Sequence, residues 1–271
     1  MDARDTAAYL ERIGYHGSRE PTLETLRALH RAHLVTVPFE NLDIHAGRPI
    51  RLDRAAFFRK IVGERRGGFC YELNGMFAEL LTALGFDVTL LSARVAQKDG
   101  GFGPELDHML LLVNLGQRWI ADVGFGRSFE EPLALDDPTE QEADGTLYRV
   151  VAGGDGWRLE SRAPGAEPTP EYTFSLRPRA LQEFAGMCDF HQICPHSNFT
   201  RKVVCSMPLP RGGRITLSGS TLVVTEGGVR RETPLEDERA VAAALQEHFG
   251  IVMPRDRRPE RDGPADPRRV V

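Results

Sequence analysis

A cysteine that follows two glycines is the first feature of this sequence that could carry out chemistry. Residues 66–70 read RGGFC, and a helical apolar pattern begins at or just after Cys70. Glycines permit a sharp turn and a close approach to a ligand. The first N–H groups of a helix lack internal partners and favour negative charge. We therefore expect Cys70 to be a nucleophile with a pKa below the ordinary value of about 8.5; a buried structural cysteine is the alternative.

A cysteine nucleophile requires a base, and His108 and Asp122 are candidates for that base and for the acid that orients it. His108 opens an apolar run at 108–115, and Asp122 lies near the end of a second run at 119–123. An acid in an apolar strand is costly to bury unless it is paired. We therefore expect the two runs to form an antiparallel hairpin in which these side chains meet. A His–Asp pair that only satisfies the core is the alternative.

The length of the turn between the two runs decides whether this pair can form. Side chains alternate between the faces of a sheet, so a two-residue turn at 116–117 would place His108 and Asp122 on opposite faces. A three-residue turn at 115–117 would pair Asn114 with Arg118 and place both on one face. The pair therefore predicts an odd-length turn or a bulge.

The segment that follows Asp122 could bind a ligand. It reads VGFGRS, in which Gly124 and Gly126 permit a close approach, Phe125 could line an aromatic slot and Arg127 could meet a phosphate. A GxG pattern alone is weak support, because it usually marks only a turn.

Hydrophobic periodicity predicts helices in the first 85 residues and mostly strands afterwards. We expect Thr22 and Asp53 to cap two helices, a third helix to start at Cys70, and Gly85 to end it. Strands are predicted at 88–95, 108–115, 119–123, 147–152, 157–161, 172–176, 214–217, 222–225 and 229–233, a short helix at 178–184, and a helix at 236–249 closed by Gly250. The loop at 97–107 is long enough to form part of a site rim.

Composition points to an ordinary globular protein and excludes several classes. Of 271 residues, 41% are hydrophobic and 27% charged, which suffices for a sizeable core. The net charge of −5 and the lack of a long basic stripe disfavour a nucleic-acid partner. No apolar run reaches the ~18–20 residues of a membrane helix, and the N-terminus lacks a signal-peptide pattern. We therefore expect a cytoplasmic protein without a membrane partner.

The cysteines other than Cys70 raise a metal-binding alternative. Cys188, His191, Cys194 and His196 are closely spaced, and Cys205 follows nearby. These are zinc-ligand types, but the spacing is not a familiar zinc pattern. In a reducing compartment the cysteines should be free rather than paired in disulfides. We interpret them as small buried hydrophobic residues and expect no metal.

Taken in order, the reactive segments resemble the arylamine N-acetyltransferase family. The resemblance spans roughly residues 10–250, and the combination of segments is far more specific than any one of them. The matching segments are 37–42 (VPFENL), 66–70 with Glu72 and Asn74, His108 with its apolar strand, 122–127, 172–176 and 197–200.

The resemblance implies an α+β fold with a core like that of the cysteine proteases and transglutaminases. An N-terminal helical bundle at 1–85 would carry Cys70, and a central antiparallel β-barrel at 86–190 would carry His108 and Asp122. A C-terminal α/β lid would follow at 191–253. The tail at 254–271 holds ten charged residues and four prolines, too little apolar surface to order itself, so we expect it to be disordered.

The resemblance also implies a function and the residues that serve it. The function would be acetyl transfer from acetyl-CoA, as co-substrate rather than bound cofactor, through an acetyl-cysteine to arylamines, arylhydroxylamines or hydrazines in xenobiotic metabolism. The implied residues are the triad Cys70, His108 and Asp122, the acceptor-pocket residues Phe39, Val95 and Phe125, the CoA-contacting residues Gly126, Phe199 and Thr221, and a buried structural ion pair between Glu40 and Arg66.

Two alternatives use the same nucleophile. Amide synthases of ansamycin biosynthesis resemble the same family and carry the same triad, but they release a polyketide chain as a macrolactam and do not use acetyl-CoA. A cysteine hydrolase would pass the acyl group to water. The oligomeric state stays open at this point.

Overall fold

Helices in the N-terminal part begin where the sequence places their caps. In the computed structural model, which describes residues 1–98, 100–143, 145–154 and 156–253, the side chains of Thr22 and Asp53 accept backbone N–H groups from the first turns of α2 and α4. The helix predicted to start at Cys70 is α5, and it begins at that residue. The helices are α1 (Ala3–Arg12), α2 (Leu23–Leu34), α3 (Leu42–His45), α4 (Arg54–Phe58) continued by the π-helix η1 (Arg59–Gly63), α5 (Cys70–Ala83), the 3-10 helix η2 (Leu181–Phe184), α6 (Ala185–Ile193), α7 (Asn198–Arg201) and α8 (Glu238–Phe249).

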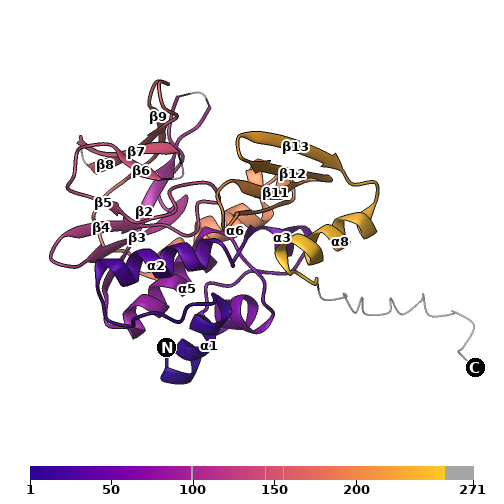
Figure 1. Ribbon diagram of the computed structural model, residues 1–271, viewed down its shortest axis with the longest axis horizontal. Coiled ribbons are helices and arrows are strands. Elements are labelled where there is room, and N and C mark those ends of the chain that lie inside the picture. Colours follow the sequence, from indigo (N-terminus) through magenta and orange to yellow (C-terminus); the bar gives the residue numbers. More distant parts are fainter. Residues whose placement is uncertain (99, 144, 155, 254–271) are drawn as a thin grey trace, which may run out of the picture.

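An antiparallel sheet of eight strands lies above helices α2 and α5, at the upper left of Figure 1. Its order is β5-β4-β3-β2-β9-β8-β7-β6, and the side-chain amide of Gln141 in β6 bonds the backbone of Ala134 in β5 at 2.7 and 3.1 Å. The two end strands therefore meet, and the sheet is a nearly closed barrel. Its strands are β2 (Asp87–Val95), β3 (His108–Asn114), β4 (Arg118–Ala121), β5 (Leu133–Ala134), β6 (Gln141–Ala143), β7 (Thr146–Gly153), β8 (Gly156–Arg162) and β9 (Thr169–Phe174).

A second antiparallel sheet lies beside the barrel and is covered by α8 (Figure 1). Its order is β1-β10-β11-β12-β13, so the short strand β1 from the N-terminal part joins strands from the C-terminal part. Leu245 and Phe249 of α8 share an apolar core with Leu217 of β11. The strands are β1 (Phe39–Glu40), β10 (Val204–Pro208), β11 (Arg214–Ser218), β12 (Thr221–Glu226) and β13 (Val229–Pro234).

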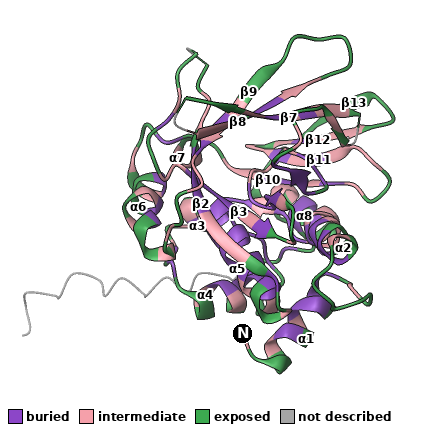
Figure 2. Ribbon diagram, turned by 90° about the vertical axis from the view of Figure 1, so that its left-hand side faces the viewer, coloured by how far each residue is buried: buried purple, intermediate pink, exposed green. Residues whose placement is uncertain are grey.

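Helix α5 is the central element of the N-terminal part. It packs against β2 and β3 of the barrel and is buried over most of its length (Figure 2). Along β3 the side chains alternate between two cores: Met109 and Leu111 face the helices, whereas Leu110 faces the barrel interior. This arrangement places the start of α5, with Cys70, against the strand that carries His108.

The region after β9 differs from the sequence expectation in one helix. The short helix expected at 178–184 is a 3-10 turn, η2, and it continues into α6, which the sequence analysis missed. The tail expected to be disordered at 254–271 lies outside the described residues. Within the part that is described, no helix is both long and apolar enough to cross a membrane.

Candidate active site

The hairpin of β3 and β4 brings His108 and Asp122 together. Asn114 pairs with Arg118 across a three-residue turn in which Gly116 has a φ of 84°, so the predicted odd-length turn is confirmed. His108 and Asp122 then share one face, and the His108 Nε2 lies 2.7 Å from the Asp122 Oδ2. A carboxylate only accepts, so Nε2 carries the proton. Nδ1 is thereby the ring nitrogen that can take a proton from a nucleophile.

Both carboxylate oxygens of Asp122 accept two hydrogen bonds. Oδ1 accepts from Asn74 Nδ2 at 2.8 Å and from the Gly124 N–H at 2.9 Å, and Oδ2 accepts from His108 and from the Tyr172 hydroxyl at 3.2 Å. Burial by itself raises the pKa of Asp122, but His108 and the hydrogen-bond donors outweigh it and hold this pKa below its ordinary value. The acid therefore stays ionised and cannot turn away from His108.

Asn74 ties the helix of Cys70 to both strands of the hairpin. It lies one turn after Cys70 on α5, and besides Asp122 its Nδ2 donates to the Met109 carbonyl at 2.6 Å. Its Oδ1 accepts from the Val123 N–H at 2.9 Å. Asn74 belongs to the segment around Cys70 that carries the family resemblance, but the sequence assigns no role to it. The structure shows a side chain that fixes the relative positions of α5, β3 and the residues after β4.

Cys70 lies at the first turn of α5 with 2% of its surface exposed. The backbone of Met109, the residue after His108, acts on this thiol in the direction of a lower pKa. The expectation of a lowered pKa was wrong: burial raises the pKa of the Cys70 thiol well above its ordinary value, and the Asp107 and Asp122 charges raise it further. The helix start favours a thiolate, but desolvation dominates at a buried sulfur. Ionisation of this thiol therefore needs a base beside it.

The loop before Cys70 rests on a buried cluster of charges. Arg66 Nη2 lies 2.8 Å from the Glu40 carboxylate, the pair expected from the sequence, and Arg66 also bonds Asp43 at 2.5 Å. Lys60 Nζ lies 2.9 Å from Glu72 Oε1, and Glu72 Oε2 accepts the backbone N–H of Phe69 at 3.2 Å. The sequence analysis missed Lys60 and Asp43, because neither stands out from an ordinary amphipathic helix. These contacts hold the turn that presents Cys70.

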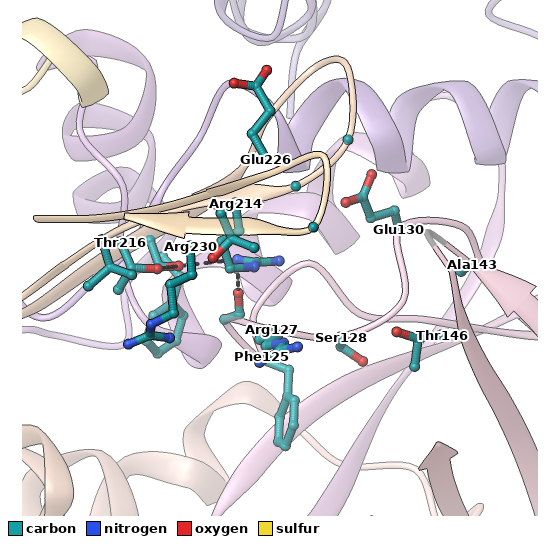
Figure 3. Close-up of a pocket in the computed structure, with 18 of the residues that line it drawn as sticks. Phe125, Arg127, Ser128, Glu130, Ala143, Thr146, Arg214, Thr216, Glu226 and Arg230 are labelled. Carbon is teal, nitrogen blue, oxygen red and sulfur yellow. Dashed lines mark hydrogen bonds between the residues drawn. The ribbon is translucent and has the colours of Figure 1, made fainter. Parts of the chain in front are cut away.

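A cavity of about 820 Å³ opens between the barrel and the second sheet (Figure 3). Phe39 and Phe125 line one part of it, and the Phe125 ring packs edge-on against His108 with centroids 5.1 Å apart. The exposed side chains of Arg127, Arg211 and Arg230 line another part. The cavity thus joins an apolar area next to the His–Asp pair to an area rich in arginine.

Segments far apart in the sequence meet around this cavity. Figure 3 shows Thr216, Arg230 and Arg214 approaching from the second sheet, with Ala143 and Thr146 of the barrel on the opposite side. Arg214 donates to the carbonyl of Gly126 at 2.5 Å and so fastens the second sheet to the 122–130 loop. The sequence could not indicate Arg211, which lies in a turn, or Arg230 of β13, because both join the cavity lining only through the way the two sheets dock.

The other residues implied by the resemblance occupy different places. Phe39, Phe125 and Gly126 line the cavity, whereas Val95, Phe199 and Thr221 do not. Val95 ends β2 and pairs with Tyr172 of β9. Phe199 packs against Phe39 with ring centroids 6.0 Å apart, and Thr221 opens β12.

The cysteines and histidines near residue 190 do not form a metal site. All four cysteines of the chain are free. Among the residues described, no three His, Cys, Asp or Glu side chains are grouped so that they could hold a metal ion. His191 instead contacts Ser197 Oγ at 3.2 Å and Asp107 Oδ1 at 3.2 Å.

Comparison with known proteins identifies the family. The sequence model of the family described as N-acetyltransferase matches residues 22–258. Arylamine N-acetyltransferase from Escherichia coli is 35% identical over 246 residues, covering 90% of this chain and 87% of the relative. The chain belongs to the arylamine N-acetyltransferase family. Human arylamine N-acetyltransferase 1 is 32% identical, with 93% and 95% covered.

Solved structures of family members agree with this assignment. The arylamine N-acetyltransferase of Salmonella typhimurium superposes with a TM-score of 0.86 at 34% identity, covering 93% of this chain and 92% of that one. The Mycobacterium marinum enzyme, solved in complex with CoA, gives 0.83 at 34% identity, with 91% and 92% covered. The resemblance drawn from the sequence is thereby confirmed, together with the expected α+β fold and enzyme class.

Proposed function

We propose that this protein transfers an acetyl group from acetyl-CoA to the nitrogen of an arylamine, arylhydroxylamine or hydrazine, through an acetyl-cysteine at Cys70. The observation that carries the proposal is the position of Cys70 at the start of α5, where Asn74 of the same helix bonds Met109 and Asp122 next to the His108–Asp122 contact. Membership of the arylamine N-acetyltransferase family supports N-acetyl transfer as the reaction. The M. marinum relative was solved in complex with CoA, and this supports acetyl-CoA as the donor.

The first half-reaction transfers the acetyl group from acetyl-CoA to Cys70. Burial disfavours a lone thiolate at Cys70, so the thiol gives its proton to Nδ1 of His108, and Asp122 stabilises the imidazolium at Nε2. The sulfur attacks the thioester carbonyl carbon, and N–H groups at the start of α5, which lack helical partners, donate to the oxyanion. The C–S bond to CoA then breaks, and the CoA thiolate takes the proton from His108. Acetyl-Cys70 and neutral His108 remain.

The second half-reaction delivers the acetyl group. The acceptor nitrogen attacks the acetyl carbon and loses a proton to His108 Nδ1. The bond to the Cys70 sulfur breaks, the amide leaves, and the thiolate–imidazolium pair is restored. Phe39 and Phe125 line the cavity beside His108 and offer rings on which an aromatic acceptor can pack. We include Val95 in this acceptor site on the resemblance alone.

The arginine-rich part of the cavity suits the phosphates of the donor. Arg127, Arg211 and Arg230 all line it, and phosphate groups are bound by arginine through two parallel hydrogen bonds. Gly126, which stands between Phe125 and Arg127 in the chain, also lines the cavity, and we propose that the pantetheine chain passes it. The resemblance adds Phe199 and Thr221 as CoA contacts.

The four free cysteines fit a reducing compartment, and we propose that the protein is cytoplasmic.

Mass spectrometry tests the proposal. Incubation with acetyl-CoA alone should add one acetyl group, located on the peptide that contains Cys70, and release one CoA. Cys70→Ala should carry no acetyl group and acetylate no arylamine. Cys194→Ala, which changes a half-buried cysteine outside the site, should keep the wild-type rate. Arylamine acetylation by Cys70→Ala would refute the proposal.

The same assay separates the rival activities. Two substrates that react in turn at one site give parallel lines in double-reciprocal plots. An amide synthase would not be acetylated by acetyl-CoA, whereas a hydrolase would lose its acetyl group to water as fast without an amine as with one. A panel of aromatic amines and hydrazines, with acetyl-CoA compared against longer acyl-CoAs, then defines the acceptor and the acyl chain.

A further inference from the structure

A buried histidine from a distant helix contacts the backbone of the proposed triad acid. His30 lies on α2, with 0% of its surface exposed. Its Nε2 accepts the backbone N–H of Asp122 at 3.1 Å, and its Nδ1 lies 2.9 Å from the Glu130 carbonyl. The ring stacks on Phe129, with planes 9° apart. His30 therefore bridges the two ends of the 122–130 loop.

The two contacts specify one protonation state of the ring. A backbone N–H can only donate and a carbonyl can only accept, so Nε2 is unprotonated and Nδ1 carries the hydrogen. Burial lowers the pKa of His30 to about 4, which keeps the ring neutral. The charged groups around it are the Asp122 carboxylate and the Glu130–Arg31 pair, with the buried His33 on the same helix.

The imidazole takes the place of a missing strand partner. β5 pairs with only Trp119 and Ile120 of β4, so the ladder stops before Asp122. The backbone N–H of Asp122 is buried and has no carbonyl of β5 opposite it, and a buried N–H without an acceptor is costly. The Nε2 of His30 is the acceptor in place of that carbonyl. The side chain of Asp122 is held by Asn74, Gly124 and Tyr172, and its backbone is held by His30.

We propose that His30 is a positioning residue for the acetyl-transfer reaction: as the neutral Nδ1–H tautomer it fixes the backbone of Asp122, and so the direction from which that carboxylate holds His108. The inference rests on the proposed function, because it takes Asp122 as the triad acid. His30 contacts the backbone of Asp122 and Glu130 and acts on the reaction only through them. It acts by keeping the 122–130 loop, with Gly124 and Phe125, closed against α2.

Three variants separate this role from simple core packing. In His30→Gln the side-chain carbonyl can reach the position of Nε2 and accept the Asp122 N–H. In His30→Asn the shorter amide can serve only the Glu130 carbonyl, near the position of Nδ1. His33→Gln is the control: His33 is equally buried, lies one turn further along α2, and bonds the Tyr9 hydroxyl rather than the triad.

The readout is single-turnover acetylation of Cys70 and steady-state arylamine transfer. His30→Asn should lower kcat on the order of 10²-fold, the cost of a small misplacement of a reacting group, with KM for acetyl-CoA unchanged. His30→Gln should recover most of this loss, and His33→Gln should keep the wild-type kcat. Equal activity in the Asn and Gln variants overturns the proposal. If wild-type Cys70 were never acetylated, the proposed function itself would fail instead.

Histidine NMR of the wild-type protein tests the same point without a variant. The ¹⁵N-labelled ring of His30 should show the Nδ1–H tautomer, and it should stay neutral well below the ordinary histidine pKa of about 6.5. His30→Gln assigns the signal by its disappearance. An Nε2–H tautomer, or protonation at the ordinary histidine pKa, overturns the proposal even if His30→Asn does not fold.

Discussion

The His–Asp pair and the arginine-lined part of the cavity differ in how firmly their side chains are held. Cys70, His108 and Asp122 are 2, 3 and 1% exposed, and both oxygens of Asp122 have two donors each. Arg127 and Arg230, in contrast, are exposed at the cavity (Figure 3), and among the described residues Arg230 bonds only Glu232, an exposed residue of the same strand, at 2.7 Å. Proton transfer needs fixed geometry, whereas binding a long, flexible anion needs charge near its path.

This comparison predicts two kinds of response to mutation. Changes at the buried end of the site, which comprises Cys70, His108, Asp122 and the groups bonded to them, should lower kcat or the stability of the fold, because each removed group leaves a partner unsatisfied. Changes at the arginine end, which comprises Arg127, Arg211 and Arg230, should raise KM for the donor and leave kcat unchanged.

Asp122→Asn should have the largest effect. The amide cannot stabilise the His108 imidazolium and allows the wrong tautomer, so kcat should fall on the order of 10⁴-fold, as in a serine-protease triad. Steady-state arylamine acetylation measures it. Asp136→Asn is the control, since Asp136 forms an exposed pair with Arg118. A loss below tenfold in Asp122→Asn would show that the buried pair is structural only.

Arg66→Met should act on stability rather than on chemistry. It leaves the Glu40 and Asp43 charges buried without their partner, and it should lower the free energy of unfolding by about 3–5 kcal/mol. Urea denaturation measures the change. Arg54→Met breaks an exposed pair with Glu79 and should cost at most about 1 kcal/mol. Equal losses would mean that burial of the cluster does not matter.

The buried end was largely predictable from sequence because each of its residues sits at a local landmark. Cys70 follows two glycines at a helix start, His108 opens a strand, and the turn at 115–117 fixes which face Asp122 occupies. What sequence could not supply was burial. The pKa of Cys70 was therefore expected in the wrong direction, since the helix start is local whereas the desolvation comes from packing against β3.

Residues that support the site from a distance gave little signal. His30 follows the apolar spacing of α2 and resembles an ordinary core histidine, although its ring meets Asp122, 92 residues away. Arg211 and Arg230 lie in or next to surface turns, and only the docking of the second sheet onto the barrel turns them into a lining. Spacing along a chain shows what shares a helix or strand face, and it is silent on which faces meet.

Gly124→Ala should impair the buried end without removing a polar group. A methyl group at this position would lie 2.8 Å from the Cys70 Cα, 3.0 Å from the Cys70 carbonyl oxygen and 2.7 Å from Asn74 Nδ2. Backbone atoms cannot move aside cheaply, so Cys70 should shift relative to His108 and kcat should fall on the order of 10²-fold. Single-turnover acetylation of Cys70 measures this.

Gly186→Ala is the matched control for Gly124→Ala. Gly186 lies in α6, and a methyl group there would meet nothing within 4 Å. Replacing a helical glycine by alanine should leave activity unchanged and stabilise the fold slightly, by about 0.5–1 kcal/mol. If Gly124→Ala were as active as Gly186→Ala, the close approach of the 122–130 loop to Cys70 would not be required for the reaction.

Arg230→Gln should have the smallest effect and should act on binding. Loss of one phosphate contact, about 1.4 kcal/mol, raises KM for acetyl-CoA about tenfold with kcat unchanged, and it weakens the rise of KM with salt. The control is Arg231→Gln: Arg231 is the next residue of β13, so its side chain points to the opposite face of the sheet and is not among the cavity lining. Equal KM values for the two variants would remove Arg230 from the donor site. A fall in kcat for Arg230→Gln would contradict the proposed division between the buried triad residues and the arginine side chains, because it would show that the donor phosphates help to place the thioester at Cys70.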